Sequence, residues 1–175
     1  NQIQIGTITA TDEDGDAVTF SVSGTELTIT SAGILSFVSA PDYETKTNYS
    51  ATVTANDGAN SVNQVISINI NNINDNIPLA RNQSFQVNEN NTNIGNISAY
   101  DADGDSITYS ISGSEISITQ QGSLSFVSSP DFETKSIYSA TVTITDGVNS
   151  SSFSISVTIL DLNEYGPVIT SGTEY

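Results

Sequence analysis

The stretch Asn48-Tyr-Ser-Ala-Thr-Val-Thr-Ala-Asn-Asp-Gly58 decides the fold, because apolar and polar residues alternate along it up to an Asp-Gly turn signal. Successive side chains of a β-strand point to opposite faces of a sheet, so this alternation predicts a strand with one buried face. That face would consist of Tyr49, Ala51, Val53 and Ala55. The same pattern returns at residues 137–147 as Ile-Tyr-Ser-Ala-Thr-Val-Thr-Ile-Thr-Asp-Gly.

This recurrence is part of a complete internal repeat. Asp12 falls on Asp101 and Pro78 falls on Pro167, at a constant offset of 89 residues without insertion. A unit of this length is large enough to own a β-sandwich core and too long for a solenoid repeat. We therefore expect two repeats, at 1–78 (incomplete at its N-terminus) and 79–167. Residues 168–175 would begin the first strand of a following repeat or act as a donor strand.

Short alternating segments fill both copies, and turn residues separate them every eight to twelve positions. The inward-facing residues are expected at 18–22, 27–29, 35–37, 49–55 and 66–70, and in the second copy at 107–111, 116–118, 124–126, 138–144 and 153–159. No segment shows a helical period. The sequence predicts an all-β chain of tandem seven-stranded antiparallel Greek-key β-sandwiches. The first copy has no counterpart of the strand around Phe85 and Val87.

The charge balance restricts the partners. Three Lys and Arg residues against 20 Asp and Glu residues give a net charge of −17, which disfavours nucleic acid and anionic membranes and favours cations. Acidity also serves solubility, so charge alone assigns no site. The chain has no Cys, His, Met or Trp, so only oxygen ligands remain for a metal. No apolar run approaches the length of a membrane span.

The acidic residues recur in clusters. Asp12-Glu-Asp-Gly-Asp16 corresponds to Asp101-Ala-Asp-Gly-Asp105, and Asp42-Tyr-Glu44 corresponds to Asp131-Phe-Glu133. Carboxylates one residue apart can reach the same loop-bound ion, and calcium accepts many oxygens in flexible geometry. The spacing does not fit an EF-hand, since Gly falls at position four of the loop and Ser at position twelve. Taken alone, a single Asp in these loops is better explained by an ordinary turn role. The recurrence of the whole set favours metal ligation instead, although a turn role explains Asp16 and Asp105 equally well.

Five segments in order resemble the cadherin repeat. They are Val87-Asn-Glu-Asn90, Tyr100-Asp-Ala-Asp103 with its partner Thr11-Asp-Glu-Asp14, the Asp-x-Glu pairs at 42–44 and 131–133, Ala51-Thr-Val-Thr-Ala-Asn-Asp-Gly58, and the linker Asn72-Ile-Asn-Asp-Asn-Ile-Pro78. The chain is most similar to bacterial or archaeal cadherin-like tandem repeats of large surface adhesins or filaments. The resemblance implies a cadherin/Ig-like sandwich with calcium ions between successive repeats.

The resemblance also implies the ligands. The joint between the two repeats would use Asp42, Glu44, Asn74, Asp75, Asn76, Asp101, Asp103 and Asp146. Two half-sites would face neighbouring repeats, one with Asp12, Asp14 and Asp57, the other with Glu89, Asp131, Glu133, Asp161, Asn163 and Glu164. The second linker departs from the first, with Glu164 in the place of Asp75 and Tyr165 in the place of Asn76.

These features predict a secreted or cell-surface module. Calcium would bind between repeats and hold a rod-like spacer rigid for cell adhesion, with adjacent repeats as partners. One alternative is a self-assembling extracellular filament, in which residues 168–175 enter an identical chain head to tail by donor-strand exchange. Another is a polysaccharide-binding surface, although most Tyr and Phe fall on core-facing positions. An enzyme is not expected, because the carboxylate pairs are better explained as calcium ligands.

Overall fold

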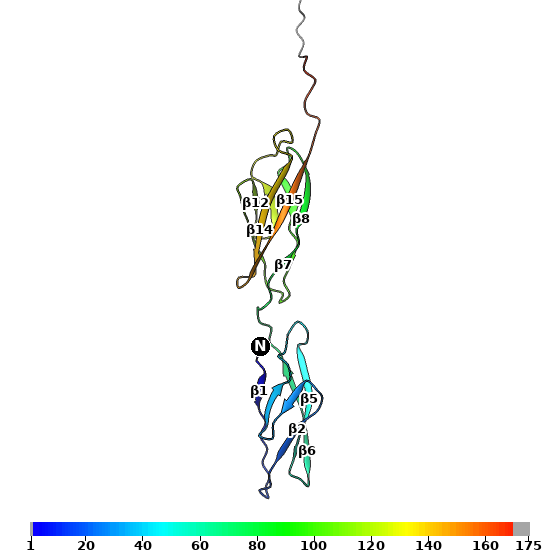
Figure 1. Ribbon diagram of the computed structural model, residues 1–175, viewed down its shortest axis with the longest axis vertical. Helices are drawn as coiled ribbons and strands as arrows, with labels where there is room; N and C mark the ends of the chain where they lie inside the picture. Colours follow the sequence, from blue (N-terminus) through cyan, green and yellow to red (C-terminus); the bar gives the residue numbers. More distant parts are fainter. Residues whose placement is uncertain (1, 170–175) are drawn as a thin grey trace, which may run out of the picture. The chain divides into compact units, whose positions relative to one another are not determined.

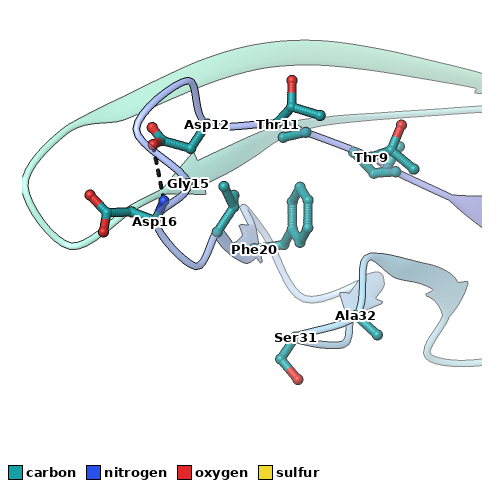
Figure 2. Close-up of a pocket in the computed structure, with 11 residues that line it drawn as sticks. Thr9, Thr11, Asp12, Gly15, Asp16, Phe20, Ser31 and Ala32 are labelled. Carbon is teal, nitrogen blue, oxygen red and sulfur yellow. Dashed lines mark hydrogen bonds between the residues drawn. The ribbon is translucent and has the colours of Figure 1, made fainter.

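Every helix or strand assigned between residues 2 and 169, which the structure describes, is a β-strand (Figure 1). Within these residues there is accordingly no helix with the length and apolarity that a membrane crossing needs. The computed structural model divides between Ile73 and Asn74 into two compact units, called unit 1 and unit 2 below.

Unit 1 contains two three-stranded sheets. Its strands are β1 (Gln4–Thr7), β2 (Thr19–Val22), β3 (Leu27–Ile29), β4 (Ile34–Phe37), β5 (Asn48–Asn56) and β6 (Ser61–Asn69). One sheet has the order β1-β4-β3 and the other β2-β5-β6, with every neighbouring pair antiparallel. The stretch that opened the sequence analysis is thus β5 and the turn after it.

Unit 2 repeats this plan and extends it. Its strands are β7 (Leu79–Ala80), β8 (Gln83–Asn88), β9 (Asn93–Asn96), β10 (Ala99–Tyr100), β11 (Thr108–Ile111), β12 (Ile116–Ile118), β13 (Ser123–Phe126), β14 (Ile137–Thr145) and β15 (Ser150–Leu160). The sheets have the orders β11-β14-β15-β8 and β12-β13-β9, and the short strands β7 and β10 pair separately.

The core of unit 2 follows the predicted alternation. Along β15, alternate residues from Phe153 to Ile159 are buried, and Val157 is completely inaccessible. Burying each such side chain contributes about 1.5–3 kcal/mol. The buried residues of unit 1 are fewer, and its cluster centres on Leu27, Leu35, Phe37 and Ala51. The two units therefore share the alternation of apolar and polar residues, but the apolar side chains are more deeply buried in unit 2 than in unit 1.

A small side-chain cluster is reproduced in both copies. Phe37 lies edge-on to Tyr49 with ring centroids 4.9 Å apart, and Phe126 lies edge-on to Tyr138 at 4.8 Å. Over each tyrosine ring sits a lysine, Lys46 or Lys135, that also pairs with a glutamate twenty residues earlier. The sequence repeat is therefore a repeat of packing as well.

The predicted all-β sandwich is confirmed, and one pairing differs from the all-antiparallel expectation. Strand β8 runs parallel to β15, from Gln83 beside Ile155 to Asn88 beside Leu160. A parallel pair needs a long connection, and here all strands from β9 to β14 lie between the two in the chain. Within residues 2–169, β6 has no such partner, as the comparison of the copies predicts.

Candidate metal centre

Asp101 is the most unusual acidic residue of unit 2. It follows β10 directly, and only 5% of its surface is exposed. Its Oδ1 accepts a hydrogen bond from the backbone N–H of Asp105 at 3.1 Å, whereas its buried Oδ2 has no hydrogen-bond partner in the described part of the chain. A buried carboxylate oxygen without a partner is costly, so this atom calls for a cation or water.

Two further carboxylates converge on Asp101. One oxygen from each of Asp101, Asp103 and Asp105 lies within 4.8 Å of the others. Gly104 turns the loop in the left-handed region, at φ 79°, which lets the chain bring Asp103 and Asp105 to one side. Burial, followed by the charges of Asp101 and Asp103, raises the pKa of Asp105. The loop therefore concentrates negative charge that a divalent cation would neutralise.

The linker residues Asn74 and Asn76 are tied to this loop within unit 2. Asn76 donates to Asp103 twice, from its backbone N–H and from its side-chain Nδ2, each at 2.9 Å. The Nδ2 of Asn149 donates to Asn74 Oδ1 at 2.8 Å and to the Asn76 carbonyl at 3.1 Å. The predicted linker ligand Asp75 is exposed and accepts from Asn76 Nδ2 at 3.3 Å.

Asp146 is held by the turn that follows β14. Its Oδ1 accepts from the backbone N–H groups of Val148 at 2.7 Å and Asn149 at 2.6 Å. Burial opposes the charged form, but these hydrogen bonds outweigh it, and the pKa of Asp146 is lowered. The carboxylate is thus oriented and kept ionised by its own turn.

A second acidic group lies at the opposite end of the long strands of unit 2. Oxygens of Glu89, Glu133 and Asp161 lie within 4.8 Å of one another. Glu89 is only 1% exposed, and its two oxygens accept from the backbone N–H groups of Phe132 at 3.0 Å and Leu162 at 2.7 Å. Glu89 therefore joins the loop after β13 to the segment after β15 while facing two more carboxylates.

The remaining predicted residues of this half-site lie around that group. The Asp131 carboxylate accepts from Thr134 Oγ1 at 2.7 Å and from the Glu133 N–H at 3.0 Å, and the bond from Thr134 is the main cause of its lowered pKa. Burial, followed by the charge of Glu89, raises the pKa of Glu164. Asn163 is exposed.

Unit 1 repeats the local geometry of these turns. Asp12 Oδ1 accepts from the N–H groups of Asp14 at 3.0 Å and Asp16 at 3.1 Å. Asp57 accepts from two backbone N–H groups of its turn, and these bonds lower its pKa. Asp42 accepts from Thr45 Oγ1 at 2.6 Å, and Glu44 lies exposed beside it. Turn formation, the alternative role for each Asp, is thus observed, and it leaves further lone pairs for a metal.

The chain is similar in sequence and in structure to known proteins. A family model described as a bacterial Ig domain matches residues 74–159. Human protocadherin-15 is 29% identical over 185 residues, covering 94% of this chain. The extracellular cadherin domains 3–6 of protocadherin gamma B2 superpose on 93% of this chain and 46% of that one, with a TM-score of 0.79 and 27% identity. The chain is built of cadherin-like repeats.

The relatives are longer than this chain and differ among themselves. The chain spans 9% of protocadherin-15 and 20% of chitinase A from Pseudoalteromonas piscicida, which is 33% identical over 161 residues and covers 89% of this chain.

Two residues of the cadherin-like unit 2 were not on the predicted ligand list. Asn149 orients the linker, although the sequence analysis did not place it at the site. Its signal is the recurring Asp-Gly-x-Asn, seen at Asp57–Asn60 and Asp146–Asn149. For Asp105 the sequence left a turn role and a ligand role open, and its carboxylate lies in the group around Asp101.

Proposed function

We propose that these cadherin-like repeats bind calcium at their ends, and that the bound ions hold successive repeats rigid. The observation that carries the proposal is the buried Oδ2 of Asp101, which has no protein partner in the described residues and lies in a group of three carboxylates. A buried carboxylate oxygen without a hydrogen-bond partner is costly, and a bound cation would supply the missing interaction.

The donor chemistry favours calcium over other metals. All candidate ligands are carboxylates, amides and backbone carbonyls, and the chain has no Cys, His or Met. Calcium takes about six to eight such oxygens at roughly 2.3–2.6 Å in irregular geometry, whereas zinc and copper prefer nitrogen and sulfur. Without a cation, each close pair of carboxylates repels by about 1–4 kcal/mol, depending on the local dielectric.

The proposed ligand set draws on both repeats. Unit 2 and its linker would supply Asn74, Asp75, Asn76, Asp101, Asp103 and Asp146, and unit 1 would supply Asp42 and Glu44. The acidic group around Glu89 would serve a following repeat in the same way. Asn76 now points its Nδ2 at Asp103, so its amide would rotate or its carbonyl would serve when an ion binds.

The biological role we propose is that of a spacer in extracellular adhesion. Calcium-stiffened repeats would hold an adhesive element away from the surface that secretes or anchors the array. Support comes from the likeness to extracellular cadherin domains. Polysaccharide binding has no comparable support, because the paired aromatic rings of both cores face inward.

Calcium titration tests the proposal. Sites with dissociation constants of about 10⁻⁴–10⁻³ M are expected for extracellular modules, so calcium at about 100 times the dissociation constant stabilises the fold by about 2.7 kcal/mol per site. The melting temperature should rise with calcium and much less with magnesium, and small-angle scattering should report a more narrowly defined radius of gyration. Equal melting temperatures in calcium and in EDTA at matched ionic strength would refute calcium binding.

A further inference from the structure

The loop that follows β10 contains one carboxylate that the ligand set proposed above leaves out. That set includes Asp101 and Asp103, and the additional carboxylate is that of Asp105. One oxygen from each of the three side chains lies within 4.8 Å of the others. Two ligands on opposite sides of one calcium ion are about 4.6–5.2 Å apart, because each lies at about 2.3–2.6 Å from the ion. Three carboxylates of a single loop can therefore share one ion.

The state of Asp101 is an independent sign of a missing cation. Its side chain is only 5% exposed, and its Oδ2 has no hydrogen-bond partner in the described residues. The turn uses only Oδ1, which accepts from the Asp105 N–H at 3.1 Å. Closing the turn therefore leaves the cost of burying the second oxygen uncompensated. A cation shared with the neighbouring carboxylates would compensate it.

The equivalent loop of unit 1 shows that such a turn does not by itself bring three carboxylates together. Asp12 Oδ1 accepts from the Asp16 N–H at 3.1 Å, as Asp101 Oδ1 does from Asp105. Asp12 is only half-buried, however. Among the described residues, oxygens of Asp12, Asp14 and Asp16 do not all lie within 4.8 Å of one another. The convergence in unit 2 is thus separate from the hydrogen bond that closes the turn.

Residues of unit 2 alone position the loop. Strand β10 ends one residue before Asp101 and pairs with β7, and Asn76 donates to Asp103 from its backbone and from its side chain. Partial desolvation is the main cause of the raised pKa of Asp105, followed by the charges of Asp101 and Asp103. The charge of Asp146 raises this pKa further, so a fourth carboxylate of unit 2 lies near the loop. No residue of unit 1 is needed to assemble these ligands.

We propose that Asp105 is a direct calcium ligand, and that Asp101, Asp103 and Asp105 hold one calcium ion with the residues of unit 2 alone. The proposal rests on the calcium binding proposed above and deepens it. The three carboxylates supply three to six of the roughly six to eight oxygens that calcium takes, and water completes the shell. Because the loop is already held in place by unit 2, little ordering opposes binding.

A self-sufficient loop divides the proposed ions into two kinds. Ions that use Asp42 and Glu44 depend on how two repeats meet, whereas the ion in the loop does not. Calcium should therefore bind to the loop of an isolated joint partner as well as to that of a closed joint. The site also needs no part of residues 168–175, the predicted donor strand, of which residues 170–175 lie outside the described residues.

Amide NMR of the whole nitrogen-15-labelled chain reads this loop directly. Gly104 lies between Asp103 and Asp105, and its N–H donates to the Asp101 carbonyl at 3.4 Å. Its chemical shift should therefore respond to an ion in the loop. Calcium is titrated into calcium-free protein at fixed ionic strength, and the Gly104 shift gives the dissociation constant of this site. Gly113, at the opposite end of β11, is the reference amide.

Asp105→Asn tests the additional ligand. The substitution removes one charge and keeps the backbone N–H that binds Asp101, so the fold in EDTA should be as stable as before or more stable. The Gly104 curve should move to calcium concentrations at least about tenfold higher, because affinity depends on the number of charged ligands. Circular dichroism and melting temperature in EDTA establish that the variant is folded. A Gly104 curve that does not move would overturn the ligand role of Asp105.

The double variant Asp42→Asn with Glu44→Gln tests self-sufficiency. It removes the two carboxylates that unit 1 would supply, and the Gly104 curve should stay where it is in the unmodified chain. A shift as large as that of Asp105→Asn would contradict an ion held by unit 2 alone. The charge control is Glu13→Gln, an exposed residue outside the group. An equally large shift in this control would mean that net charge, and not ligation, sets the curve.

The same titration distinguishes this inference from the proposed function. If the melting temperature is equal in calcium and in EDTA and no amide moves, the chain does not bind calcium and both fail. If calcium raises the melting temperature while Gly104 does not respond, calcium binds elsewhere and only the loop site fails. A Gly104 response that is lost in Asp105→Asn and kept in the double variant is the result expected.

Discussion

At the scale of the residue, the carboxylates of the acidic turns accept hydrogen bonds from their own loops. Asp146 uses Oδ1 to close its turn, while Asp101 uses Oδ1 to bind the Asp105 N–H and leaves Oδ2 without a partner. A turn role and a ligand role are therefore compatible. What distinguishes Asp101 is burial, since it is the more deeply buried and has the unpartnered oxygen.

Replacing Asp101 by Asn tests this distinction. Asn keeps an Oδ1 for the Asp105 N–H and removes one charge from the group, so stability in EDTA should hold or rise. Calcium affinity should fall at least about tenfold, which corresponds to about 1.4 kcal/mol. Calorimetric titration measures the calcium affinity and thermal unfolding in EDTA measures the stability, with the exposed Glu13→Gln as the control. Unchanged calcium affinity in Asp101→Asn would remove Asp101 from the ligand set.

Asn149 gives a second residue-scale prediction. Its side chain joins Asn74 and Asn76 to the Asp146 turn, so Asn149→Ala leaves part-buried acceptors unpaired and should cost about 1–3 kcal/mol. In the described part of unit 1, the side chain of the equivalent Asn60 donates to Asp57 of its own turn, so Asn60→Ala should cost less. Urea unfolding of both variants in EDTA makes the comparison, and equal losses would argue against a special role for Asn149.

At the scale of the element, the equivalent strands β6 and β15 can be compared directly, because β15 has β8 beside it and β6 has no such neighbour in the described residues. Ile159 is 1% exposed with β8 beside it, whereas Ile70 is half-buried. Ile159→Ala should therefore cost about 2–5 kcal/mol and Ile70→Ala clearly less. Denaturant unfolding of the two variants measures the difference. Similar losses would show that β8 contributes little to the burial of β15.

These elements also show which parts of the fold and of the candidate site can be predicted from the sequence. The alternation of Tyr138, Ala140 and Val142 predicts a strand and its buried face, because period two is a local property. The parallel pairing of β8 with β15 depends on where a distant segment arrives, so no local pattern encodes it. The acidic clusters were found because they recur, but the bond from Asn76 to Asp103 depends on a side-chain rotation that spacing does not specify.

At the scale of the whole molecule, the net charge of −17 opposes folding, since like charges are brought closer in a compact chain. In EDTA, the melting temperature should rise as sodium chloride screens this repulsion. In calcium, the same addition of salt should have a smaller effect, because bound ions already neutralise the acidic groups. Scanning calorimetry over a salt series measures both slopes. Salt slopes that match with and without calcium would count against neutralisation at these groups.

The parallel pairing of β8 and β15 has a mechanical consequence. In unit 2 the chain passes through the short strand β7 into β8, and β15 is the last strand of the described residues. Strands β8 and β15 are in register over six residue pairs. Tension applied through the chain pulls these strands in opposite directions along their length. The hydrogen bonds between them are therefore loaded together in shear. If the first and last strands were antiparallel, the same tension would break the hydrogen bonds between them one at a time. A tether built from such units would therefore resist stretching through the hydrogen bonds of a single strand pair.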